Sequence, residues 1–178
     1  MSEGLGPLLK GWAGFLLGRR LAPFHPTPTH IARRMLRLAR VQASDHVVDL
    51  GAGDGQLVVA AAQLGVRLAE GYELDTHLAE VAAQRIQRLG LSNARVLNEN
   101  ALQADLSPAS VVCLYLSDSG NKQVLPIILQ RAQNPPPLRV VSLHFPLPPE
   151  VTPVQTDRVD GLELFLYEFG ALSQILRA

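Results

Sequence analysis

Three glycines at alternate positions, Gly51, Gly53 and Gly55, follow directly after the apolar run His46–Leu50. A short apolar run that ends at glycines is typical of a buried strand, and the helix-forming run Gln56–Leu64 begins next. Glycine allows the backbone to turn tightly and to come close to a ligand. The feature therefore predicts a strand–turn–helix unit whose turn binds a ligand.

The rest of the chain alternates strand and helix patterns, and the pattern changes near the C-terminal end. The segments Val154–Val159 and Leu162–Tyr167 flank Asp160-Gly161, a dipeptide that favours a hairpin turn. Strands that alternate with helices indicate an α/β fold with a doubly wound, mostly parallel sheet, here with a C-terminal antiparallel hairpin. Ligands of such sheets lie beyond the carboxyl ends of the strands. We expect parallel strands at His46–Leu50, Arg67–Glu73, Ala94–Leu97, Ser110–Leu116 and Arg139–Phe145, and helices at Gln56–Leu64, Asp75–Leu89 and Lys122–Ala132.

The first 25 residues differ from the rest. Their apolar side chains fall at helical spacing and predict an amphipathic helix, made by Leu8, Leu9, Trp12, Phe15 and Leu16 and followed by Arg19 and Arg20. Its apolar stretch is far shorter than the roughly 20 residues that a membrane span needs. The helix therefore either packs on the domain or docks on a membrane surface or a partner. A proline-rich lead-in completes residues 1–25, and we expect the ligand-binding domain over residues 26–178, with Thr29 capping its first helix.

Composition excludes several classes of function. The chain has 178 residues, which is enough for one compact domain with a buried core. Sixteen lysines and arginines balance sixteen aspartates and glutamates, which argues against a nucleic-acid partner. Cys113 is the single cysteine, so no internal disulfide forms, and no Cys/His spacing resembles a metal site. We interpret Cys113 as a buried apolar residue and expect a cytoplasmic protein.

The charges around the glycine turn separate two classes of cofactor. Dinucleotide-binding turns follow G-x-G-x-x-G, whereas this chain has Gln56 in place of the third glycine and Asp54 inside the turn. A carboxylate there repels a pyrophosphate but attracts a cation, such as the sulfonium and amino group of S-adenosylmethionine (SAM). Asp49 at the strand end can brace the turn, and Glu73 at the end of the next strand can accept hydrogen bonds from ribose hydroxyls. The charge pattern favours SAM over a nicotinamide dinucleotide.

The run from Val47 to Leu89 resembles motifs I and II of class I SAM-dependent methyltransferases. A longer resemblance, from residue 26 to about residue 167, points to the small protein-lysine methyltransferases similar to those that modify the adenine nucleotide translocase and the ATP-synthase c subunit, with their bacterial relatives. It rests on segments in a fixed order: PTP (26–28), VVDLGAGDG (47–55), GYELD (71–75), ADLS (104–107), LYL (114–116) and VVSLHF (140–145). The resemblance implies a Rossmann-like fold, SAM as cofactor and S-adenosylhomocysteine (SAH) as product.

The resemblance also implies which residues bind the cofactor. By position these are Gly51, Ala52, Gly53 and Gly55 at the methionine end, Glu73 at the ribose, Leu74, Asn100 and Ala101 at the adenine, Tyr115 and Leu116 after the fourth strand, and Thr27 and Thr29 across the mouth. The sequence departs from the family pattern at two places. Asn100 stands where an aspartate is usual, and residues 117–121 replace a proline-containing segment. The Asn-Pro-Pro-Tyr type of motif, which marks methylation of planar amines, does not occur.

Three residues near the ends of the fourth and fifth strands are candidates for contact with the methyl acceptor: Tyr115, Asn121 and His144. Each also has a structural interpretation: Tyr115 as a wall of the cofactor site, Asn121 as a cap or turn residue, and His144 as a core histidine. The resemblance favours a protein lysine as acceptor. Two alternatives share every cofactor feature: methylation of a small molecule, and a SAM-binding protein retained for assembly or sensing without catalysis.

Overall fold

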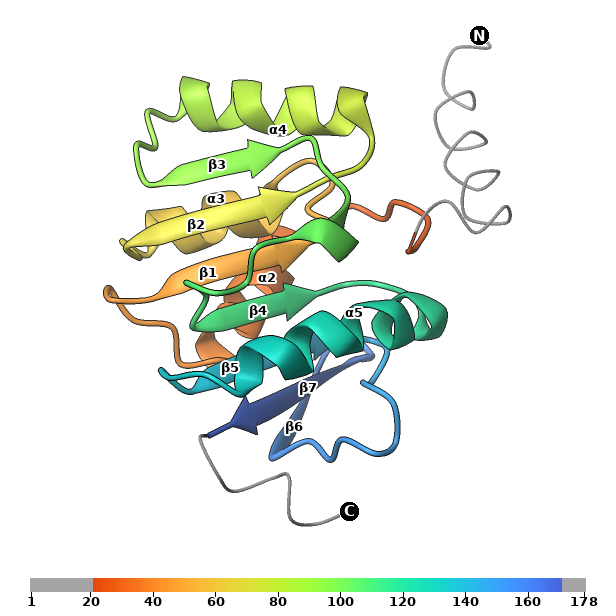
Figure 1. The fold of residues 1–178 in the computed structure, drawn as a ribbon. Coiled ribbons are helices and arrows are strands. Elements are labelled where there is room, and N and C mark those ends of the chain that lie inside the picture. Colours follow the sequence, from red (N-terminus) through yellow and green to blue (C-terminus); the bar gives the residue numbers. More distant parts are fainter. Residues whose placement is uncertain (1–20, 171–178) are drawn as a thin grey trace, which may run out of the picture.

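The computed structural model describes residues 21–170, which fold around a single seven-stranded sheet (Figure 1). The helices are α2 (Thr29–Leu38), α3 (Gln56–Gln63), α4 (Thr76–Arg88) and α5 (Asp118–Ala132), with the short 3-10 helix η1 (Ala101–Gln103). The strands are β1 (His46–Leu50), β2 (Leu68–Tyr72), β3 (Ala94–Leu97), β4 (Val111–Leu114), β5 (Leu138–Leu143), β6 (Gln155–Val159) and β7 (Leu162–Phe169). The predicted N-terminal helix lies outside the described residues.

The strand order β3-β2-β1-β4-β5-β7-β6 is that of a doubly wound sheet. β1 pairs in parallel with β2 on one side and with β4 on the other, so the direction of winding reverses between these two neighbours. β7 runs antiparallel to both β5 and β6. The predicted fold class is therefore confirmed, including the C-terminal hairpin. Reversal of the winding leaves a crevice at the carboxyl ends of β1 and β4, where ligands of such folds bind.

Helices cover both faces of the sheet because alternate strand residues point to opposite sides. Val47 packs in the cluster beneath α2 and α3, whereas its neighbour Val48 packs in the cluster beneath α5. Each strand residue of β1 and β4 is buried, as expected for a parallel sheet with both faces covered. Cys113 is fully buried in the first cluster, which confirms its interpretation as a core residue.

Two helix starts differ from the sequence prediction. Thr29 does not cap α2: the cap is Pro28, whose carbonyl oxygen accepts hydrogen bonds from the backbone N–H of Ile31 and Ala32. Helix α5 begins at Asp118 and not at Lys122, because the side chain of Ser117 accepts a hydrogen bond from the N–H of Gly120 at 3.1 Å. The segment 117–121 is thus the cap and first turn of a helix. The short helix η1 was not predicted.

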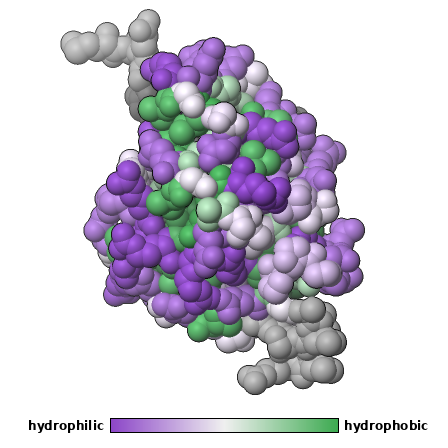
Figure 2. All heavy atoms as spheres, turned by 90° about the vertical axis from the view of Figure 1, so that its left-hand side faces the viewer, coloured by the Kyte–Doolittle hydropathy of each residue, from purple (hydrophilic) through white to green (hydrophobic). Residues whose placement is uncertain are grey.

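The C-terminal hairpin is fastened to the first helix by charge. Asp160 and Gly161 have φ angles of 50° and 79°, as the predicted tight turn requires. Arg34 of α2 donates to Asp157 at 2.5 Å, and His30 lies 2.6 Å from Asp160. The end of the molecule from which the parallel strands start is mostly hydrophilic, with hydrophobic residues in small separate patches (Figure 2). The cavity described next lies at the opposite end.

Candidate cofactor site

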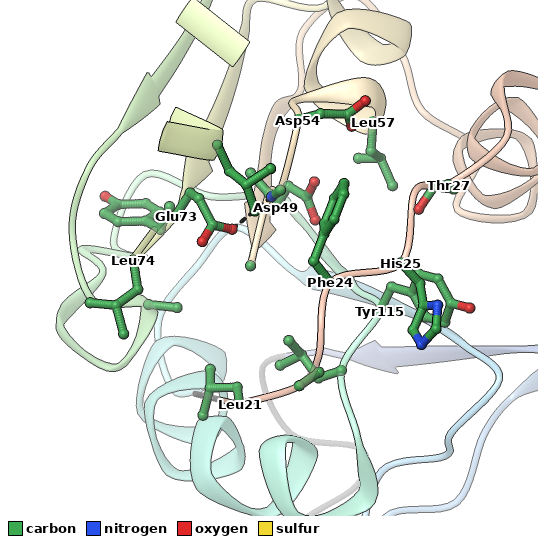
Figure 3. Close-up of a pocket in the computed structure, with 18 of the residues that line it drawn as sticks. Leu21, Phe24, His25, Thr27, Asp49, Asp54, Leu57, Glu73, Leu74 and Tyr115 are labelled. Carbon is green, nitrogen blue, oxygen red and sulfur yellow. Dashed lines mark hydrogen bonds between the residues drawn. The ribbon is translucent and has the colours of Figure 1, made fainter. Parts of the chain in front are cut away.

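A cavity of about 320 Å³ opens at the carboxyl ends of β1, β2 and β4 (Figure 3). Its position is the crevice that the reversal of winding predicts. Most of the predicted cofactor residues line it: Thr27, Asp49, Gly51, Ala52, Gly53, Asp54, Glu73, Leu74, Asn100, Ala101, Tyr115 and Leu116. Residues from β1, β2, β4 and their following loops therefore converge on one volume, as the sequence motifs suggest.

The glycine turn forms the floor of this cavity. The N–H groups of Gly51 and Ala52 donate to the carbonyl oxygen of Tyr72 at 2.9 and 3.0 Å, which holds the turn against the end of β2. Gly53 has a φ of +55°, and a Cβ there would lie 2.6 Å from the ring of Phe24. A side chain at Gly53 is thus excluded both by its backbone conformation and by its neighbour.

Glu73 is held in place at the end of β2 by the backbone around it. Its carboxylate is buried and accepts hydrogen bonds from the N–H of Gly53 at 2.7 Å and of Asp75 at 2.8 Å. The side-chain amide of Asn98 donates to the carbonyl oxygen of Glu73 at 2.9 Å. Each carboxylate oxygen retains a further lone pair for a ligand. The side chain therefore reaches the cavity already oriented.

Three carboxylates, those of Asp49, Asp54 and Glu73, give the cavity a negative charge. Burial raises the pKa of Asp49 to about 7, and the nearby charges of Glu73 and Asp54 act in the same direction. Asp54 is partly neutralised by Arg85, whose guanidinium lies 3.2 Å away. An ionised Asp49 is costly in this surrounding, and a bound cation would stabilise it. The cavity is therefore electrostatically suited to a positively charged ligand.

The adenine side of the predicted site is built by Leu74, Asn100 and Ala101. Leu74 follows β2 and is exposed, so its side chain is available to cover a flat ring. Asn100 caps η1, with its Oδ1 accepting from the N–H of Leu102 at 3.0 Å. The same oxygen retains a second lone pair, and its amide group retains donors. Asn100 can therefore still bind a base edge, as its position in the resemblance implies.

Two predicted cofactor residues do not line the cavity. Thr29 is exposed in the first turn of α2. Gly55 caps α3 in a left-handed conformation, and a Cβ there would lie 2.8 Å from the Cβ of Ala82. Gly55 thus allows α3 and α4 to pack closely, and its lack of a side chain serves the fold.

Known proteins share the motifs that build this cavity. Residues 49–155 match the family model described as the ANTKMT methyltransferase domain. A protein-lysine N-methyltransferase of Saccharolobus islandicus is 32% identical over 154 residues, covering 83% of this chain and 94% of that protein. The chain belongs to the ANTKMT methyltransferase family.

Other relatives of this methyltransferase extend the comparison. The mouse adenine nucleotide translocase lysine N-methyltransferase is 38% identical over 105 residues, which are 57% of this chain and 44% of that protein. A crystal structure described as an RNA methyltransferase from Salinibacter ruber in complex with SAH has a TM-score of 0.75 and 32% identity, covering 82% and 94% of the two chains. The predicted SAM-dependent methyltransferase activity is confirmed by these comparisons.

Two of the three candidate acceptor residues of this methyltransferase lie outside the cavity. Asn121 is fully buried in α5, and its amide nitrogen donates to the carbonyl oxygens of Phe145 and Pro146 at 3.0 and 2.9 Å. It ties α5 to the turn after β5, so it is neither a cap nor a wall of the cavity. His144 is exposed in that turn with a φ of 69°, so its interpretation as a core histidine is wrong. Neither residue lines the cavity.

Tyr115 is the candidate that does line the cavity, half-buried after the end of β4. Burial raises the pKa of its phenol, so the hydroxyl keeps its proton at neutral pH. It lies next to His25 at the side of the cavity away from Glu73 and Leu74 (Figure 3). Tyr115 therefore forms a polar wall and is not an ionised base.

Sequence reasoning missed a set of lining residues: Leu21, Ala22, Pro23, Phe24, His25, Gln56, Leu57, Tyr72, Leu78, Leu102 and Gln123. The first five belong to the lead-in before α2, which the sequence patterns separate from the ligand-binding domain. An apolar Phe24 among prolines is the one signal in the sequence that sets this segment apart from an ordinary linker. Among residues 21–170, no group of three His, Cys, Asp or Glu is placed to hold a metal ion.

Proposed function

We propose that this methyltransferase transfers the methyl group of SAM to the side-chain amine of a protein lysine. The observation that carries the proposal is the acidic cavity on the glycine turn, in a chain whose relatives include named lysine methyltransferases. These are the proteins from Saccharolobus islandicus and mouse, and the Caenorhabditis elegans lysine N-methyltransferase of the ATP-synthase c subunit, which is 26% identical over 139 residues.

The residues of the cavity fit SAM. Glu73 would hold the ribose hydroxyls, Leu74, Asn100 and Ala101 the adenine, and the N–H groups and carboxylates around Gly51 and Gly53 the methionine end. A side chain at Gly53 would collide with the ring of Phe24, so the turn leaves room for a ligand only with glycine there. The excess of carboxylates matches the two positive charges of SAM.

The protein contributes positioning and exclusion of water, because SAM supplies a methyl group that is already activated on a sulfonium. A lysine amine attacks only when neutral, and its reference pKa is roughly 10.4. The side of the cavity away from Glu73 offers the half-buried hydroxyl of Tyr115 and the side chains of His25 and Thr27. Partial burial among these groups disfavours the charged ammonium, and the Tyr115 oxygen can accept an N–H hydrogen bond from the neutral amine.

Other acceptors are less well supported by the chain. The formal net charge is zero at pH 7, whereas an RNA-binding surface needs an excess of positive charge. At the end of β4 the sequence is Leu114-Tyr115-Leu116-Ser117, without the prolines of the motif that marks planar-amine methylation. Methylation of a small molecule would use the same cofactor residues.

One assay separates these acceptors. Bacterial lysate fractions of protein, RNA and small molecules are incubated with radiolabelled SAM and the purified enzyme, with Gly53→Arg as the control whose cavity is filled. We expect label in protein bands, lost with the control variant, and one added CH₂ mass per methyl on lysine in the peptide map. Label in ribonuclease-sensitive material or only in the small-molecule fraction would refute the lysine proposal. SAH binding without label in any fraction would indicate a non-catalytic SAM-binding protein.

We further propose that the enzyme works in the cytoplasm and contacts the membrane surface through its N-terminal helix. The apolar residues Trp12, Phe15 and Leu16, followed by Arg19 and Arg20, form the pattern of an interfacial helix. Among residues 21–170, no helix is long and apolar enough to cross a membrane. A surface contact would bring the cavity close to lysines of membrane proteins.

A further inference from the structure

The segment Leu21–Thr27, which we call the strap, crosses the mouth of the cofactor cavity and supplies much of its lining. It is extended because prolines at 23 and 26 prevent a helix. Figure 3 shows it running past the cavity from Leu21 to Thr27, with Phe24 between them. The strap is therefore part of the cavity wall, although it precedes the first predicted element of the domain.

The start of the strap is fixed to the first turn of α5. The hydroxyl of Ser117 donates to the carbonyl oxygen of Leu21 at 2.6 Å, while it also caps α5. Gly120 faces the same carbonyl, and a Cβ at this position would collide with it. Leu21 and Ala22 pack against the hydrophobic cluster beneath α5. The contact therefore depends on a small residue at 120 and on a hydrogen-bond donor at 117.

The far end of the strap is fixed by α2. Pro28, the residue after Thr27, caps this helix through its carbonyl oxygen. Helix α2 is in turn buried along one side against the core, with Ile31, Met35 and Leu36 each at most 3% exposed. The middle of the strap thus hangs between two anchored ends, over the glycine turn.

Phe24 projects from the middle of the strap into the cavity, between Asp49 and Leu57 (Figure 3). Its ring approaches Gly53 so closely that a Cβ there would lie 2.6 and 2.9 Å from two ring carbons. Phe24 is half-buried, and among the described residues it belongs to neither hydrophobic cluster. A large apolar ring that faces a polar, acidic cavity gains little from its own fold, but it can cover a ligand.

We propose that Phe24 is a cofactor-positioning residue, which the strap holds over the ligand on the glycine turn. The ring covers the cofactor and excludes water from it, and the strap must move before the cofactor can enter or leave. This inference rests on the proposed function, since it requires SAM and SAH to bind at the glycine turn. It adds a residue and a segment that the motifs of the sequence do not include.

The test measures binding and not turnover. Dissociation constants and dissociation rates of SAH are compared for wild type, Phe24→Ala, Phe24→Leu and the matched control Phe145→Ala. Phe145 is a half-buried ring in the turn after β5, outside the cavity. We expect Phe24→Ala to weaken SAH binding about ten-fold or more, with faster dissociation, and Phe24→Leu to lie between it and wild type. Phe145→Ala should change affinity by less than about two-fold.

Two variants outside the cavity test the strap itself. Ser117→Asp keeps an acceptor for the Gly120 N–H but cannot donate to Leu21, and Gly120→Ala pushes on the Leu21 carbonyl while favouring the helix. We expect both to stay folded, to speed SAH dissociation and to lower affinity several-fold. They also decide the matter if Phe24→Ala does not fold.

The outcomes separate this inference from the proposed function. Failure of wild type to bind SAH would overturn the proposed cofactor site. Wild-type binding with unchanged affinity and rate in the Phe24 variants, or an equal loss in Phe145→Ala, would overturn only the role of Phe24.

Discussion

Glu73 has two tasks that a single substitution can separate. Its carboxylate accepts the backbone N–H groups of Gly53 and Asp75, and it is also the predicted ribose ligand. Glu73→Ala leaves a buried N–H without an acceptor, so we expect a loss of about 1–3 kcal/mol in unfolding free energy together with a large loss of SAH affinity. Glu73→Gln keeps one acceptor oxygen and should lose less stability. Thermal denaturation and calorimetric SAH titration of both variants measure the two effects.

Asp49 makes the stability of the ligand-free protein depend on pH. Its pKa is about 7 in the folded protein against a usual value of 3.8, so the folded state binds a proton that the unfolded chain has released. Stability should therefore fall as pH rises from about 4 to about 7. Asp49→Asn removes this effect, and we expect it to exceed wild type in stability at pH 8 by roughly 1–4 kcal/mol.

The control for Asp49→Asn is pH itself. Near pH 4 the difference from wild type should largely vanish, because Asp49 is then protonated in the folded protein. Urea unfolding at the two pH values measures the difference. An equal gain at both pH values would show that the effect is not ionisation of Asp49.

At the scale of single residues, the sequence identified the side chains that follow a pattern. Gly51, Gly53 and Glu73 were found because a turn after a strand and an acid at the end of the next strand have fixed spacings. Gly55 fits the same spacing, yet its contact is with Ala82 of another helix. Phe24 follows no periodicity, because an extended proline-flanked segment has none. Its role depends on a long-range contact that only the folded chain shows.

Among the elements, α5 joins the cofactor cavity to the end of β5. Asn121 carries this link through two carbonyl oxygens, those of Phe145 and Pro146. We expect Asn121→Ala to cost about 2–3 kcal/mol of unfolding free energy, since both buried acceptors lose their donor. Methyl transfer per folded molecule should stay near wild type, because Asn121 does not line the cavity. Chemical denaturation and activity normalised to folded protein test the two parts.

Asn121→Asp is the companion variant. A carboxylate has the same shape but cannot donate when ionised, so it should be at least as destabilising. A stable Asn121→Ala protein with activity reduced a hundred-fold would instead return Asn121 to the set of candidate acceptor residues.

The elements themselves were largely predictable, and their ends were not. The bounds of β1 and β3 match the prediction, because an apolar run and the surrounding turn residues define each of them. The start of α5 was missed by four residues, since Ser117-Asp118-Ser119-Gly120 resembles a loop in composition. The hydroxyl of Ser117 turns it into a capped helix start.

At the scale of the whole molecule, the alternation of strands and helices predicted the fold, and the fold predicted the position of the cavity. The order of the strands and the contribution of the strap did not follow from local patterns. Both depend on contacts between segments far apart in the chain. The acceptor side of the cavity is the least predictable part, because it uses residues from the lead-in and from the end of β4.

The proposed membrane contact is also a property of the whole chain. We expect the full-length protein to co-sediment with vesicles that contain anionic lipids, and Trp12→Glu with Leu16→Glu to abolish this binding. Leu129→Glu is the matched control, since Leu129 is an exposed leucine on α5. Equal sedimentation of the double variant and wild type would contradict a role for the N-terminal helix.

The hairpin that ends the sheet has a consequence for behaviour at high concentration. An outer strand with free backbone groups invites a strand from another molecule, and this is a common start of aggregation. Here the outer strand β6 is short and its Gln155, Thr156 and Arg158 are exposed, while Asp157 is paired with Arg34 across from α2. Charged, hydrated side chains along so short a margin disfavour such growth. The same hairpin that completes the fold thus also keeps neighbouring copies apart.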